Sequence, residues 1–85
     1  MSVVPEKTVT DIVTDFLGSG PSLAEIAAYR LPEDLQRRAH DLLDENQVRR
    51  LSDEEQAEME EFRRIDHLLT LVKAKARLRL KTQHE

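Results

Sequence analysis

The chain after Ser52 contains no glycine and no proline, and this feature most constrains the fold. Ser52-Asp53-Glu54-Glu55 is a capping box, in which a serine hydroxyl and a carboxylate three residues later satisfy free backbone amides. The residues that follow are nearly all good helix formers. They predict a helix over about 53–81, which spans about 42 Å at about 1.5 Å per residue. This helix takes about a third of the 85 residues.

Caps and chain breakers divide the preceding residues into three shorter helices. Thr8 and Ser22 are each followed three residues later by a carboxylate and begin the first two helices. Pro32 suits the first turn of the third. The predicted ranges are about 8–17, 22–29 and 32–47. We expect an all-α fold in which these helices pack on the long one as a single domain over 8–85, with residues 1–7 as a flexible arm.

Residues 72–81 also carry a competing pattern, because their apolar and basic side chains alternate. Alternation with a period of two is typical of a strand. Ala, Lys, Arg and Leu all favour helix, and an unbroken helical sequence leads into the segment. We therefore predict that the helix continues to about residue 81.

The long helix has apolar residues on two opposite sides when its residues are placed at 100° steps. A stripe about 80° wide is predicted to lie under the shorter helices. Its members are Phe62, Ile65, Leu69, Val72, Ala76 and Leu80. The second set is Leu71, Ala74 and Leu78 with His67, and Leu68 lies between the two sets.

So short a chain is expected to leave part of this helix for a partner, because small domains often need oligomerisation. We predict a homo-oligomer, in the simplest case a dimer. The predicted interface residues are Phe62, Ile65, Leu68, Leu69, Leu71, Val72 and Leu78. The alternative is that the shorter helices wrap around the long helix and cover both of its sides.

Charge is divided along the chain, with a net −8 before position 72 and a net +4 after it. Residues 53–61 hold six acids and no base, and residues 73–81 hold five bases and no acid. An antiparallel pair of long helices would place each acidic half beside a basic half. The same pattern also complements the dipole of a single helix, which requires no partner.

Sequence motifs for catalysis or metal binding are weak. The chain has no cysteine, which excludes disulfides, thiolate catalysis and cysteine-ligated zinc. His40 and Asp44 are four residues apart on a predicted helix, a spacing that metal ligands share with ordinary solvated faces. Acid–base catalysis needs two carboxylates with different environments in one cleft. We predict no enzymatic activity, no cofactor and no metal site.

No apolar run is long enough to cross a bilayer, and residues 1–7 lack the pattern of a signal peptide. We expect a cytoplasmic protein without membrane contact.

Nucleic-acid binding is the alternative function, because residues 22–46 have the outline of a helix-turn-helix. The candidate contacts are Gln36, Arg37, Arg38, Arg77 and Arg79. Two acids, Glu33 and Asp34, begin the presumed recognition helix, and the chain has a net charge of −4. Both features oppose binding to DNA, because its phosphates are also negatively charged.

Three segments resemble a group of small, uncharacterised bacterial helical proteins that are common in cyanobacteria and often encoded beside a nuclease-like gene. They are SLAEIAAYRLPEDLQRR at 22–38, LSDEEQAEMEEF at 51–62 and LLTLVKAKARLRL at 68–80. The resemblance implies an antitoxin-like or nuclease-accessory protein that acts by binding a partner protein. It carries over no functional residue.

Together these observations predict a non-enzymatic protein–protein interaction module that self-associates through its long helix and binds another protein. Two alternatives stay open. One is a dimeric DNA-binding transcriptional regulator, and the other is a structural homo-oligomer.

Overall fold

The structure is a computed structural model that describes residues 7–83, and within this range it is entirely helical, without strands. Four helices follow one another along the chain. They are α1 (Val9–Gly18), α2 (Leu23–Ala27), α3 (Glu33–Val48) and α4 (Asp53–Gln83). The predicted all-α fold with three short helices and one long helix is confirmed. Most of the predicted N-terminal arm, residues 1–6, lies outside the described residues.

The caps expected from the sequence start three of the four helices. At α2, the Glu25 N–H donates to Ser22 Oγ at 3.1 Å, and the Ser22 N–H donates to Glu25 Oε1 at 3.1 Å. Ser52 and Glu55 exchange the same two bonds at α4, at 2.9 and 3.1 Å. The hydroxyl of Thr8 caps α1. These local bonds explain why the predicted helix starts are accurate to within about two residues.

α4 is an unbroken helix of 31 residues, so the alternating segment 72–81 is helical. Ala76 is buried within it, whereas Lys75 and Arg77 on either side are exposed. The alternation therefore reflects one buried position between basic residues, and the helix propensity of the segment prevails over its pattern.

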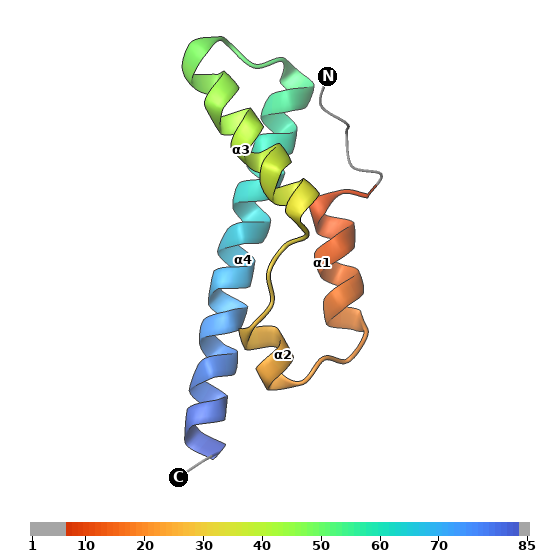
Figure 1. Cartoon of the computed structure of the whole chain (residues 1–85), viewed down its shortest axis with the longest axis vertical. Helices are drawn as coiled ribbons and strands as arrows, with labels where there is room; N and C mark the ends of the chain where they lie inside the picture. The colour runs from red at the N-terminus through yellow and green to blue at the C-terminus, as the bar shows by residue number, and fades with distance from the viewer. Residues whose placement is uncertain (1–6, 84–85) are drawn as a thin grey trace.

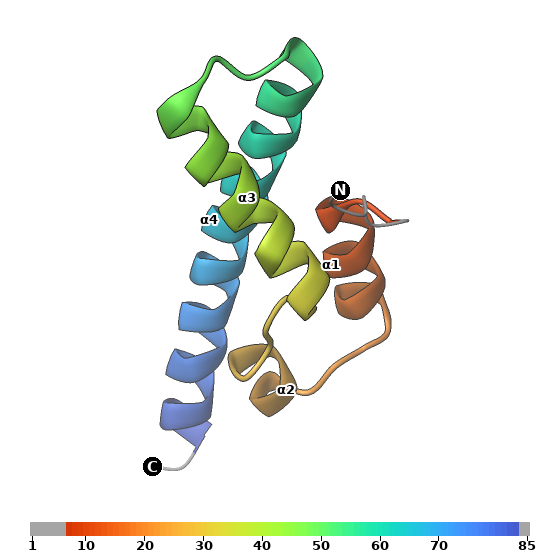
Figure 2. The same cartoon turned by 45° about the horizontal axis from the view of Figure 1, so that its top comes forward.

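α1, α2 and α3 all lie on the same side of α4 (Figures 1 and 2). α3 and α4 form a helical hairpin joined by residues 49–52, and α2 packs against the second half of α4. The turn between α1 and α2 contains Gly20 with a φ of +76°, a conformation that glycine adopts without strain. The result is an elongated molecule of 51 × 23 × 18 Å.

The core forms where α1, α3 and the first half of α4 meet. It comprises Val9, Val13, Leu35, Leu42, Leu51, Met59, Phe62, Ile65 and Leu69. Further along α4, Ala76 is buried on the side that α2 covers. Every large apolar cluster therefore faces the one side of α4 on which the shorter helices pack.

Candidate interaction surface

Within residues 7–83, no other segment covers the side of α4 opposite the core. The exposed fractions of Leu68, Leu71 and Leu78 are 43 %, 48 % and 62 %. His67 and Ala74, on the same side, are also exposed. We call His67, Leu71, Ala74 and Leu78 the outer stripe of α4. The alternative in which the shorter helices wrap around both sides of α4 is therefore wrong.

Three residues predicted for the interface belong to the core instead. Phe62, Ile65 and Leu69 are between 7 % and 9 % exposed, because α1 and α3 pack over them. Val72 is partly buried on the same side. Periodicity assigned these residues correctly to one apolar stripe, but adding that stripe to an interface was an error. Of the predicted set, Leu68, Leu71 and Leu78 remain available to a partner.

In the first half of α4, the acids with internal partners hold the other helices in place. Glu58 accepts two bonds from the guanidinium of Arg38 on α3, at 2.7 and 2.9 Å, and this ion pair is largely shielded from solvent. The hydrogen bonds that Arg38 donates to Glu58 raise the pKa of Arg38. Glu61 Oε2 accepts from the hydroxyl of Thr10 on α1 at 2.9 Å. Charges in this half thus stabilise the fold of the single chain.

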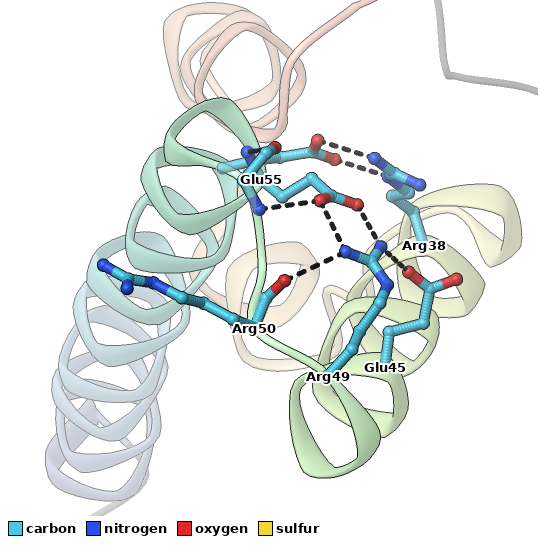
Figure 3. A network of polar contacts seen from close by, with 7 residues as sticks. Arg38, Glu45, Arg49, Arg50 and Glu55 are labelled. Carbon is cyan, nitrogen blue, oxygen red and sulfur yellow. Dashed lines mark hydrogen bonds and ion pairs between the residues drawn. The ribbon is translucent and has the colours of Figure 1, made fainter.

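A second charge network closes the turn between α3 and α4 (Figure 3). The Arg49 guanidinium bonds to Glu55 at 2.7 and 3.1 Å and also pairs with Glu45. Its hydrogen bonds, with those from Ser52, lower the pKa of Glu55 to about 2. The same network raises the pKa of Arg49. Both shifts follow from the geometry of the turn.

Two bases in the second half of α4 hold the end of α2. Lys73 Nζ donates to the Tyr29 carbonyl at 2.7 Å, and Arg77 donates to the Ala27 carbonyl at 3.3 Å. Cations interact favourably with the free carbonyls at a helix C-terminus. Sequence reasoning assigned neither contact, because the partners are backbone atoms more than forty residues away.

The remaining charges of α4 are exposed. Within residues 7–83, the three bases Lys75, Arg79 and Lys81 form no side-chain hydrogen bond or ion pair. The same holds, within that range, for four acids and two bases of the first half. The acids are Asp53, Glu54, Glu60 and Asp66, and the bases are Arg63 and Arg64. The structure thus separates the charges that bond within the fold from charges that stay exposed at the surface.

The candidate nucleic-acid contacts do not form one free surface. Gln36 Nε2 donates to the Leu31 carbonyl at 2.6 Å, and Arg38 is held by Glu58. Arg37 is exposed and lies 3.5 Å from Glu33. The other two candidates, Arg77 and Arg79, come from the far half of α4. α2 has five residues and packs on α4, so the outline of a helix-turn-helix lacks its first supporting helix.

A groove between α3 and α4 was missed by sequence reasoning. Its volume is about 240 Å³, and its lining includes Leu31, Leu43, Met59 and Phe62. Most ligand pockets are larger, at about 300–1,000 Å³. Its lining comes from α3, α4 and the segment before α3, and periodicity along one helix does not reveal a groove between helices.

Ligands for a metal ion do not converge in the part of the chain that the structure describes. His40 and Asp44 are both exposed on α3. Along residues 7–83, no helix combines the length and apolar character that crossing a membrane requires. No protein-family model, curated protein or solved structure matches the chain.

Proposed function

We propose that this protein is a non-enzymatic protein–protein interaction module whose binding surface is the uncovered side of α4. The observation that carries the proposal is the exposure of Leu71 and Leu78 on the outer stripe. Burying a leucine side chain is worth about 1.5–3 kcal/mol, so two half-exposed leucines on one rigid helix favour a partner. The occupant we propose is a second copy of the chain.

The titratable groups also favour binding over catalysis. Each shifted pKa within residues 7–83 has a structural cause. A cap lowers the pKa of Glu25, and burial raises the pKa of Tyr29, which stacks on Phe16. Ion pairs shift the remaining groups. These causes are all structural, as we expect of a protein that acts by binding.

The test replaces Leu71 by lysine and Leu78 by glutamate together and measures mass in solution by light scattering. The wild type is expected to exceed the 9.8 kDa of one chain. The double variant is expected to have the mass of one chain with unchanged helicity, because both side chains are exposed in the single chain. Val48→Glu is the matched control, since Val48 is 83 % exposed on α3 and away from this surface. Unchanged association of the double variant would refute the proposal.

The biological role we propose is that of an antitoxin-like or nuclease-accessory protein, supported by the resemblance of residues 22–38, 51–62 and 68–80. Its test is co-expression with the nuclease-like protein that the resemblance implies is encoded nearby. A complex of fixed stoichiometry with altered nuclease activity would support this role. Separate elution and unaltered activity would contradict it.

A further inference from the structure

The free charges of α4 indicate how a second copy would lie on the outer stripe. Arg63, Arg64 and Asp66 lie near the middle of the helix, and the other free charges form two groups at its ends: Asp53, Glu54 and Glu60 near its start, and Lys75, Arg79 and Lys81 near its end. All six side chains of the two end groups are exposed. Because the other acids and bases of residues 53–61 and 73–81 bond elsewhere within the chain, these six remain available to another molecule.

The spacing of the two groups fits one antiparallel register. Pairing Asp53 with Lys81, Glu54 with Arg79 and Glu60 with Lys75 places the midpoint of every pair within one residue of His67. Asp53, Glu60, Lys75 and Lys81 lie within about 80° of the centre of the outer stripe at 100° per residue. His67 lies on that stripe and is exposed. A two-fold axis through His67 would therefore place Asp53 beside Lys81 and Glu60 beside Lys75 in both halves of the pair, while Glu54 and Arg79 lie farther round the helix.

We infer that two copies pair through α4 in antiparallel orientation, with His67 of each copy at the two-fold axis and each acidic half beside a basic half. The inference rests on the proposed function and specifies the partner and its position. The paired segments span residues 53–81, about 42 Å of helix. Leu71 then faces Arg63 and Arg64 of the second copy, whose aliphatic stems can cover it. Leu78 faces Gln56 and Ala57.

The competing register matches leucine to leucine and is disfavoured by charge. Placing Leu71 opposite Leu78 of the second copy moves the axis beside Ala74 and shortens the overlap to about residues 66–83. That range contains all five bases of residues 73–81, and its only described acid is Asp66. The six free bases of the two copies, Lys75, Arg79 and Lys81 from each, would then lie close together along one short overlap. Like charges at close range oppose association, whereas opposite charges specify register and orientation.

Cysteine cross-linking distinguishes the two registers, because the chain has no cysteine of its own. His67→Cys and Ala74→Cys place single thiols on the same exposed stripe, seven residues apart. A disulfide needs Cα atoms about 4.4–6.8 Å apart, which only residues at the axis of an antiparallel pair reach. Asn46→Cys, exposed on α3, measures cross-linking by random collision.

We expect oxidised H67C to run mainly as a covalent dimer without reductant, and A74C to cross-link no more than N46C. Circular dichroism of each variant checks that its helices are retained. Cross-linking of A74C alone would establish the leucine-matched register and overturn the inference. Cross-linking of both would indicate parallel helices, which also overturns it. Absence of cross-linking in a wild-type-like oligomer would place the second copy elsewhere, and a wild type with the mass of one chain would refute the proposed function itself.

Discussion

Along the first half of α4, residues 53–66, the shorter helices α1 and α3 cover the inner side, and acids bond to side chains on both. Along the second half, residues 67–83, the five-residue helix α2 is the main cover, and the bases that hold it bond to backbone carbonyls. Three of the four leucines that are exposed within residues 7–83, Leu68, Leu71 and Leu78, thus lie in the half of α4 that has the smaller cover. The comparison shows that one helix of a small chain can differ in cover along its length. The core lies mainly on the first half, and the exposed leucines, where we propose that a partner binds, lie on the second half.

The largest expected effect is on stability in the first half. Phe62→Ala removes a side chain that is 8 % exposed in the centre of the core. Large-to-small changes of this kind cost about 3–5 kcal/mol. We expect a much lower urea midpoint by circular dichroism, or an unfolded chain. Leu78→Ala in the second half is the control and, at a concentration at which the chain has the mass of one copy, should change the free energy of unfolding by less than about 0.5 kcal/mol. Equal urea midpoints for the two variants would contradict the conclusion that the first half of α4 contributes more to stability than the second half.

The next effect concerns the ion pair that joins α3 to α4. Arg38→Met leaves Glu58 partly buried without its donor, and we expect a loss of about 1–3 kcal/mol in the free energy of unfolding. The neighbouring Arg37→Met removes an exposed pair with Glu33 and should cost less than about 0.5 kcal/mol. Urea titrations of both variants compare two arginines of α3 that differ mainly in burial. Similar losses would mean that burial does not increase the contribution of the Arg38–Glu58 pair to the free energy of unfolding.

The smallest effect on stability is the pH dependence of the turn. The pKa of Glu55 is lowered in the folded chain from 4.5 to about 2. Its contribution is therefore complete above about pH 4.5 and declines as the pH falls toward about 2. Unfolding measured from pH 7 to pH 2 should show that Glu55→Gln is less stable than the wild type at neutral pH and that the gap narrows in acid. A gap that stays constant over this range would contradict the assignment to Arg49 and Ser52.

Sequence reasoning predicted the features that depend on neighbours along the chain. The capping boxes at Ser22 and Ser52 place helix starts because their bonds span three residues. The separation of Phe62 from Leu71 on opposite sides of α4 follows from the helical repeat alone. The continuity of α4 through residues 72–81 follows from helix propensity, even though the pattern competes with it.

Features that depend on how helices meet were not predictable in this way. The bonds from Arg38 to Glu58 and from Thr10 to Glu61 join residues 20 and 51 positions apart. Several acids and bases have suitable types, so composition does not select these pairs. Arg38 is therefore predicted as a nucleic-acid contact, although it bonds to Glu58. Phe62 is predicted as an interface residue, although α1 and α3 pack over it. Which charges remain free became evident only after the internal pairs were known.

The most direct test of the paired α4 helices exchanges their free charges. One variant carries Lys75→Glu, Arg79→Glu and Lys81→Glu, and the other carries Asp53→Lys, Glu54→Lys and Glu60→Lys. In an antiparallel pair, each variant alone would place like charges together, whereas a mixture of the two would restore opposite charges along both halves. Circular dichroism checks helicity, because three of the changes oppose the helix dipole near the start of α4.

Sedimentation equilibrium of each variant and of their equimolar mixture is the decisive measurement. We predict the mass of one chain for each variant alone and a 1:1 complex for the mixture, which weakens as salt increases. If each variant alone associates as strongly as the wild type, the charges of α4 do not align two copies, and the account of its second half is wrong.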